Sequence, residues 1–260
     1  GGADVLTVEL AAATGLEKVS NVTSTDSVTF DNVPNTVDVN LKSAVGTTTV
    51  DFGKAGLAGT ADAITVTLNG TNSTTLAFTD DDALQTVALE TITIASQSVP
   101  NTLADLQTTG VATSALHVTG DKLLTITAAL DSEILTVDAS GSSGGLSLGA
   151  APGFANATVT GSSGADTLTA APVGVTNLSL GAGNDTVDFD ATLTAADIVD
   201  GGDGTDTVTI SGGNLTAVSV LGGLSNVEVL KLDTAHTITL ESNVGPTTFD
   251  FTDATDQILN

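Results

Sequence analysis

Three glycine-rich segments of this chain each contain an aspartate that is followed two residues later by a large apolar residue. They span residues 161–168, 180–187 and 201–208, and they fit the pattern G-G-x-G-x-D-x-U, in which U is apolar, with two departures: Ser162 replaces the second glycine of the first repeat and Leu180 the first glycine of the second. Glycine permits tight turns that point backbone carbonyl oxygens inward, and the aspartate adds a carboxylate oxygen. Ca²⁺ prefers oxygen ligands of this kind. The pattern is therefore typical of the calcium-binding repeat of a parallel β-roll.

The spacing of the three repeats indicates how they would share calcium. Because Ca²⁺ takes about six to eight oxygen ligands, one turn cannot supply them all, and an ion must lie between two stacked turns. Asp185 follows Asp166 by 19 residues and Asp206 follows Asp185 by 21, close to the length of two nonapeptides. We expect one ion in each of the two gaps. The predicted ligands are Gly161, Ser163, Asp166, Gly181, Gly183, Asp185, Gly201, Asp203 and Asp206.

The turns need β-strands to position them, and the sequence supplies these. Apolar residues alternate with Thr, Ser, Asp or Asn at period two, for example over residues 63–68, 123–127 and 227–232, which is typical of half-buried strands. Residues 176–180 and 193–199 are expected to form the wall opposite the glycine turns. Helix is scarce, with short turns predicted only over residues 83–86 and 101–106.

The sequence therefore predicts an all-β fold, a right-handed parallel β-roll or β-helix with calcium-binding turns. We expect residues 113–232 to form the roll, residues 1–112 a less regular β-rich flanking module, and residues 233–260 the start of a further β-module. Residues 3–8 resemble residues 205–210. The chain thus begins and ends at similar points of a repeating plan, and we interpret it as a piece of a longer protein.

The composition excludes several classes of function. The chain has 31 acidic residues against five lysines and no arginine, which gives a formal net charge of −26. Nucleic acids and anionic membrane surfaces are bound by clustered basic side chains, so neither is expected as a partner. No run approaches the ~20 apolar residues of a transmembrane helix. Without cysteine no disulfide can form, and bound calcium would take over the stabilising role.

Sequence motifs of enzymes are also absent. The chain has neither the G-x-S-x-G motif of a lipase nor the H-E-x-x-H motif of a metalloprotease. His117 and His236 have no neighbouring Cys or His with which to bind zinc. The acidic run at residues 80–82 favours a solvated turn or a helix cap over a secondary calcium site or a glycosidase pair. We therefore expect no catalytic activity.

The sequence resembles the RTX-type, calcium-dependent surface-layer (S-layer) proteins of Gram-negative bacteria. The three repeats carry the RTX part of the resemblance, and residues 157–166, 180–185, 199–206 and 223–230 carry the S-layer part. The resemblance is closest over residues 113–232. It implies type I secretion, folding on contact with external Ca²⁺, and self-association into a two-dimensional lattice in which Ca²⁺ also bridges subunits. No secretion segment or cell-anchoring module is recognisable within this piece.

Two functions from different classes follow. The first is a structural subunit of a calcium-dependent S-layer at the extracellular cell surface, with a cell-surface polysaccharide as an anchoring partner bound through regions outside this piece. The alternative is a segment of a large secreted RTX adhesin that binds a glycan or another surface. Ligand pockets are usually lined by apolar and aromatic side chains. The chain has no Trp or Tyr, which favours the lattice subunit.

Overall fold

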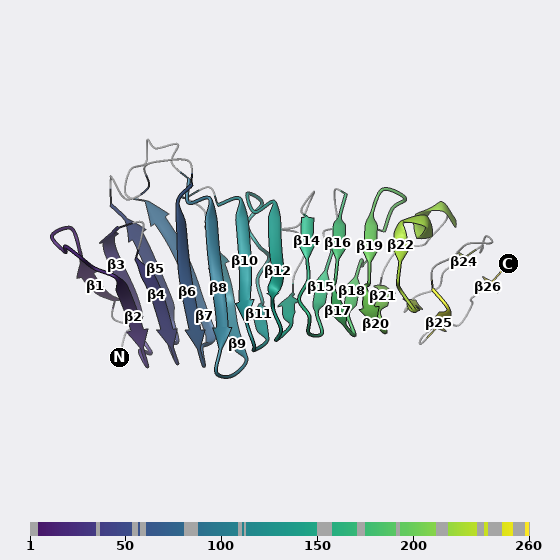
Figure 1. Cartoon of the computed structure of the whole chain (residues 1–260), viewed down its shortest axis with the longest axis horizontal. Helices are drawn as coiled ribbons and strands as arrows, with labels where there is room; N and C mark the ends of the chain where they lie inside the picture. Colours follow the sequence, from purple (N-terminus) through teal and green to yellow (C-terminus); the bar gives the residue numbers. More distant parts are fainter. Residues whose placement is uncertain are drawn as a thin grey trace.

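The chain forms an elongated stack of parallel β-strands (Figure 1). The computed structural model describes residues 5–34, 37–53, 57, 61–80, 88–108, 111, 113–149, 158–170, 175–190, 193–211, 218–232, 237–238, 246–251 and 258–259. Within these ranges the one helical element is the 3₁₀ helix η1 (Val218–Gly223). The structure thus confirms a parallel β-solenoid, as the alternating pattern and the repeats predict. The predicted turn at residues 83–86 lies outside the described residues.

Two long sheets form the walls of the solenoid, and successive turns of the chain add one strand to each. Every pairing is parallel. The first sheet consists of β1 (Val5–Glu9), β3 (Ser27–Val33), β5 (Thr47–Phe52), β7 (Asn72–Asp80), β9 (Asn101–Gln107), β11 (Leu124–Ile126), β13 (Leu146–Leu148), β15 (Thr167–Thr169), β18 (Thr186–Asp188), β21 (Thr207–Ile210), β23 (Val229–Leu232) and β25 (Thr248–Phe251).

The second sheet consists of β2 (Lys18–Val22), β4 (Asp38–Lys42), β6 (Ala63–Asn69), β8 (Thr91–Gln97), β10 (Ala115–Gly120), β12 (Thr136–Ser142), β14 (Thr158–Thr160), β16 (Asn177–Ser179), β19 (Ile198–Asp200) and β22 (Leu224–Ser225). It contains β16, as predicted over residues 176–180, and β19. The prediction of a strand over residues 193–199 is wrong for most of its length, because residues 193–197 form a turn closed by the Asp197 N–H donating to the Thr194 carbonyl, and β19 begins only at Ile198. Two short pairs complete the topology: β17 (Ala182–Gly183) with β20 (Asp203–Gly204), and β24 (Thr237–Ile238) with β26 (Ile258–Leu259).

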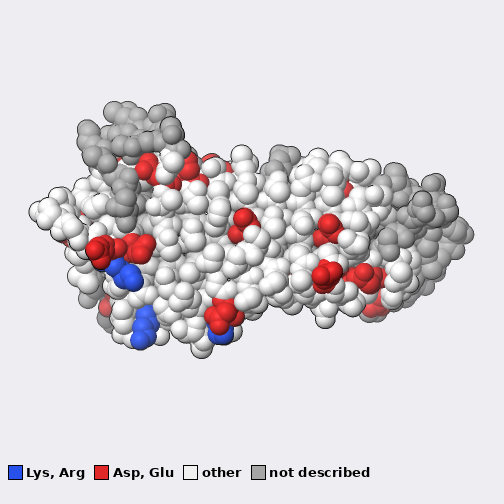
Figure 2. All heavy atoms as spheres, in the orientation of Figure 1, with Lys and Arg blue, Asp and Glu red and all other residues white. Residues whose placement is uncertain are grey.

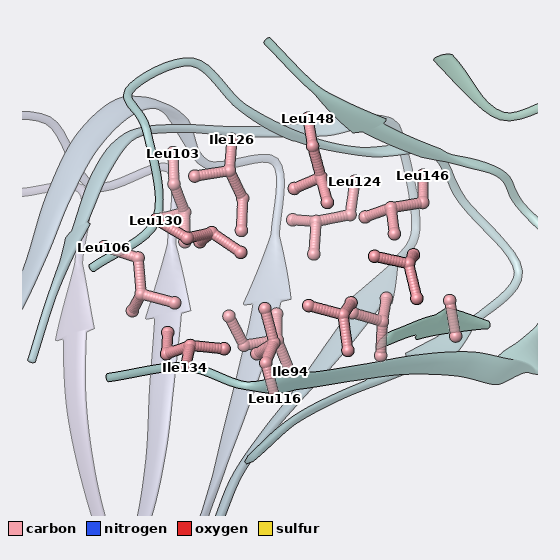
Figure 3. Close-up of a cluster of buried hydrophobic side chains, with 14 of the residues drawn as sticks. Ile94, Leu103, Leu106, Leu116, Leu124, Ile126, Leu130, Ile134, Leu146 and Leu148 are labelled. Atoms are coloured by element: carbon pink, nitrogen blue, oxygen red, sulfur yellow. The ribbon is translucent and has the colours of Figure 1, made fainter. Parts of the chain in front are cut away.

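The hydrophobic core is a narrow column between the two walls. Leu103, Ile126 and Leu148 occupy equivalent positions on successive strands of the first sheet, and they face Ile94 and Leu116 of the second sheet (Figure 3). All five side chains are buried. Because successive side chains of a strand point to opposite faces, the intervening Thr, Ser and Asp residues face outward. Core and surface are therefore set by the same period-two alternation.

Both sheets continue past residue 112, where the sequence predicts a boundary between modules. Ala115 of β10 lies in register with Thr91 of β8, and Leu124 of β11 with Asn101 of β9. Strands of the first two predicted units, residues 1–112 and 113–232, therefore belong to the same two sheets. The strands shorten along the solenoid, from nine residues in β7 to three in β15. The division of the chain into three units stays a prediction.

The prediction of a helical turn over residues 101–106 is wrong, because this segment forms strand β9. Its first side chain, that of Asn101, is fully buried and connects neighbouring turns of the solenoid. The Asn101 amide donates to Ser96 Oγ (2.9 Å), and its Oδ1 accepts a hydrogen bond from the Thr71 N–H (2.9 Å). Leu103 then enters the core. Strand pairing on both sides of β9 outweighs the local preference for a turn after Pro100.

Candidate metal centre

The three glycine-rich turns stack directly on one another at one corner of the solenoid. Thr167, Thr186 and Thr207 lie in mutual register on β15, β18 and β21, so the aspartate that precedes each of them occupies the same position in successive turns. The second and third turns also pair through β17 and β20. This is the stacking that the spacing of the repeats predicts.

The three aspartates form a ladder of backbone-capping hydrogen bonds. The Asp166 N–H donates to Asp185 Oδ1 (2.7 Å), and the Asp185 N–H donates to Asp206 Oδ1 (2.8 Å). All three side chains are at most 1 % exposed. Each aspartate therefore uses one carboxylate oxygen to satisfy the backbone of the preceding turn.

Glycine is required in these turns because the stacked backbones approach each other closely. Gly202 has φ +89° and Gly204 has φ +146°, a region of backbone conformation that side chains disfavour. A Cβ on Gly202 would overlap the carbonyl oxygen of Gly181, and one on Gly204 would overlap that of Gly183. The glycines thus allow carbonyl oxygens of one turn to lie against the backbone of the next.

In the first turn, both carboxylate oxygens of the aspartate are already hydrogen-bonded. Asp166 Oδ1 accepts from the Leu146 N–H (2.6 Å) and from Ser162 Oγ (2.8 Å), and Oδ2 accepts from the Ser162 N–H (2.7 Å). Ser162 stands where the repeat pattern has its second glycine. The serine hydroxyl therefore supplies a partner that the consensus turn would lack.

The second and third turns differ, because each leaves one buried carboxylate oxygen without a partner. Asp185 Oδ2 and Asp206 Oδ2 are both buried and accept no hydrogen bond. Burial raises the pKa of Asp185 to about 6, and the nearby charges of Asp166 and Asp206 contribute to the rise. Burial likewise raises the pKa of Asp206. An ionised oxygen in such a position is costly unless a cation or a proton accompanies it.

A hard divalent cation fits this arrangement better than a transition metal. Calcium binds carboxylate and carbonyl oxygens, and the stacked turns supply both. No group of three or more His, Cys, Asp or Glu side chains converges in the part of the chain that the structure describes. A cation between turns would therefore take most of its ligands from backbone carbonyls, and Asp185 and Asp206 would supply the carboxylate oxygens.

The remaining predicted ligands all lie in the three stacked turns. Gly161 and Gly201 are buried, Gly183 is half-buried, and Ser163, Gly181 and Asp203 are exposed. The Gly181 carbonyl accepts a hydrogen bond from the Asp203 N–H (2.9 Å), which links the second turn to the third. The set of ligands stays a prediction, and the structure adds that Asp166 has no free carboxylate oxygen.

Sequence reasoning missed one residue of this ladder, Glu228. Val229 lies in register with Thr207, so Glu228 follows Asp206 in the column of acidic residues. Glu228 Oε2 accepts a hydrogen bond from the Asp206 N–H (2.8 Å). The sequence contains one signal that could have identified it: Glu228 lies two residues before the apolar Leu230, as Asp206 lies two residues before Val208.

An acidic residue at the opposite corner shows what a purely structural carboxylate looks like in this fold. Asp197 is 1 % exposed. Its Oδ1 accepts from the Thr176 N–H (2.7 Å), and its Oδ2 accepts from the N–H (2.7 Å) and hydroxyl (2.8 Å) of Thr194. Both oxygens are satisfied by the protein, in contrast to those of Asp185 and Asp206.

Other residues that the sequence singles out add no further site. His117 is exposed on β10 beside Asp138 of β12. His236 and the acidic residues at positions 81 and 82 lie outside the described residues. Within the described ranges no helix has the length and apolar character needed to cross a membrane.

Comparisons of the chain with models of protein families, with curated proteins and with solved structures find no match.

Proposed function

We propose that this chain is a calcium-dependent structural solenoid. The observation that carries the proposal is the pair of buried, unpartnered carboxylate oxygens on Asp185 and Asp206. They lie in stacked turns whose sequence pattern is typical of calcium-binding β-rolls. Bound calcium would neutralise these oxygens and hold neighbouring turns together, and the free energy of binding would then contribute to folding.

At the level of the whole protein, we propose a secreted subunit of a bacterial S-layer that assembles into a two-dimensional lattice when Ca²⁺ binds. The resemblance of residues 113–232 to RTX-type S-layer proteins supports this role, as does the large negative charge of −26. Such a charge repels itself in the compact state and between subunits, and divalent cations offset both effects. Type I secretion, a location at the cell surface and the absence of catalytic activity belong to the same proposal.

Assembly is the property that tests this role. Metal-stripped protein is mixed with CaCl₂ while particle size is followed by light scattering and the products are imaged by negative-stain electron microscopy. An S-layer subunit is expected to grow into sheets above the calcium concentration that saturates its glycine-rich turns. The Asp185→Ala variant is expected to assemble only at higher calcium concentrations. Folding with calcium but without any growth would contradict the lattice role and favour the adhesin segment.

A further inference from the structure

A fourth turn stacks on the three glycine-rich turns although it lacks their sequence pattern. Ser225 of β22 lies in register with Asp200 of β19, and Val229 of β23 lies in register with Thr207 of β21. Residues 226–228 therefore lie directly beside residues 201–206. The corner formed by the three glycine turns thus continues by one level.

The fourth turn has fewer residues than the other three, and its acidic residue is a glutamate, whose side chain is longer than that of aspartate. Only Asn226 and Val227 separate Ser225 from Glu228, and Asn226 adopts φ +50° in place of a glycine. With its additional methylene group, Glu228 still reaches the Asp206 N–H and accepts its hydrogen bond at 2.8 Å. Glu228 therefore plays the part in the fourth turn that an aspartate plays in the other three.

Oxygen atoms from the third and fourth turns gather around Gly201. A Cβ on this glycine would lie 2.7 Å from Asp206 Oδ2 and closer still to the carbonyl oxygen of Asn226. Asp206 is 0 % exposed, and its Oδ2 has no hydrogen-bond partner. The gap between the two turns is therefore lined by a buried, unsatisfied carboxylate oxygen and a backbone carbonyl, and the Glu228 carboxylate lies beside it.

The electrostatics of this gap favour a cation. Burial raises the pKa of Asp206, and the negative charges of Glu228 and Asp200 raise it further. On the face shown in Figure 2, acidic side chains are visible in the region of β19 and β20 with no lysine beside them, and the visible lysines lie between the N-terminal end and the middle of the solenoid; Lys231 lies on β23. The repulsion among these carboxylates would be offset by a divalent ion in the gap.

We propose that the third and fourth turns bind a calcium ion between them, with Asp206 Oδ2, the Asn226 carbonyl oxygen and the Glu228 carboxylate as protein ligands. The inference rests on the proposed calcium binding and extends it to a turn that the repeat pattern does not mark. It also extends the series of ions by one gap toward the C-terminal end of the ladder.

The test compares Glu228→Gln with Glu133→Gln, a matched change at an exposed glutamate on the surface. Glutamine keeps an oxygen that can accept from the Asp206 N–H, so only the charge is removed. Bound calcium per chain is counted by equilibrium dialysis of each full-length variant, and far-UV circular dichroism at saturating calcium checks the fold. Glu228→Gln is expected to bind one calcium fewer than the wild type, whereas Glu133→Gln is expected to bind the same number.

The outcomes separate this inference from the proposed function. Calcium binding by Glu228→Gln with the same number and affinity as the wild type would overturn the inference and leave calcium-dependent folding intact. A wild-type chain that binds no calcium would overturn both. If Glu228→Gln does not fold, a crystal structure of the calcium-loaded wild type decides. A calcium ion in contact with Asp206 and Glu228 would support the inference, and an empty gap would overturn it.

Discussion

The unpartnered carboxylate of Asp185 predicts an unusual dependence of stability on pH in metal-free protein. Its pKa is raised from 3.8 to about 6 in the folded chain, so the folded state favours the protonated acid. The stability that protonation provides is complete below about pH 3.8 and is lost as the pH rises through 6. Since one pKa unit corresponds to about 1.4 kcal/mol, the full effect is about 3 kcal/mol, and Asp185 alone is expected to lower the free energy of unfolding by about 2.5 kcal/mol between pH 4 and pH 7.

The substitution Asp185→Asn isolates this contribution. Asparagine has the same shape, keeps an oxygen to accept from the Asp166 N–H, and carries no charge at any pH. The general repulsion within a chain of net charge −26 is almost the same in both proteins and cancels in their difference. Urea unfolding of calcium-free protein, followed by far-UV circular dichroism from pH 4 to pH 7, gives that difference at each pH.

The expected result is that the wild type loses about 2.5 kcal/mol relative to Asp185→Asn across this range, with the change centred between pH 4 and 6. Saturating calcium is expected to restore the stability of the wild type at pH 7 and to have a smaller effect on the variant. A difference that stays constant with pH would refute the reasoning, because it would mean that Asp185 is not desolvated in the folded chain.

Two further predictions concern packing. Gly202→Ala is expected to destabilise the calcium-bound protein by about 2 kcal/mol or more in urea unfolding, because a side chain strains a left-handed backbone and the new Cβ would overlap the Gly181 carbonyl oxygen. The control is Gly222→Ala, whose Cβ would meet no neighbouring atom. Thr48→Val is expected to cost about 1–3 kcal/mol, because it removes the acceptor of the buried Asn21 amide (2.9 Å). The double variant Asn21→Leu/Thr48→Val is expected to recover most of that loss. Thermal unfolding of the two single variants, Thr48→Val and Asn21→Leu, and of the double variant measures this, and purely additive effects would contradict the explanation.

The sequence predicted the stacking of the glycine turns because the signals that determine it are local. Each turn contains the glycines that its own backbone conformation requires, and each is followed by an alternating segment that can form a wall. Since Asp166, Asp185 and Asp206 recur at nearly constant intervals, one register brings them together. The same alternation identified the inward-facing core residues.

Other features depend on contacts between distant residues, and the sequence did not reveal them. The hydroxyl of Ser162 satisfies Asp166 only because the turn folds back on itself. Glu228 joins the ladder although its turn lacks the glycine pattern, because β21 and β23 set the register from outside the turn. Asn101 was expected in a helical turn, and its role in β9 follows from pairing with strands more than 20 residues away.

The central claim is that calcium completes the folded state of this solenoid, and a calcium titration of metal-stripped protein tests it most directly. Far-UV circular dichroism is recorded at pH 7.5 as CaCl₂ is added at constant ionic strength, with MgCl₂ as the comparison. The account predicts that metal-free protein is folded but less stable, and that calcium produces a saturable rise in the unfolding temperature with a further gain of β-structure, at concentrations where magnesium, which tolerates irregular ligand geometry poorly, has little effect. A spectrum that is already fully β-structured without metal and does not change on addition of calcium, together with unchanged thermal stability, would contradict it.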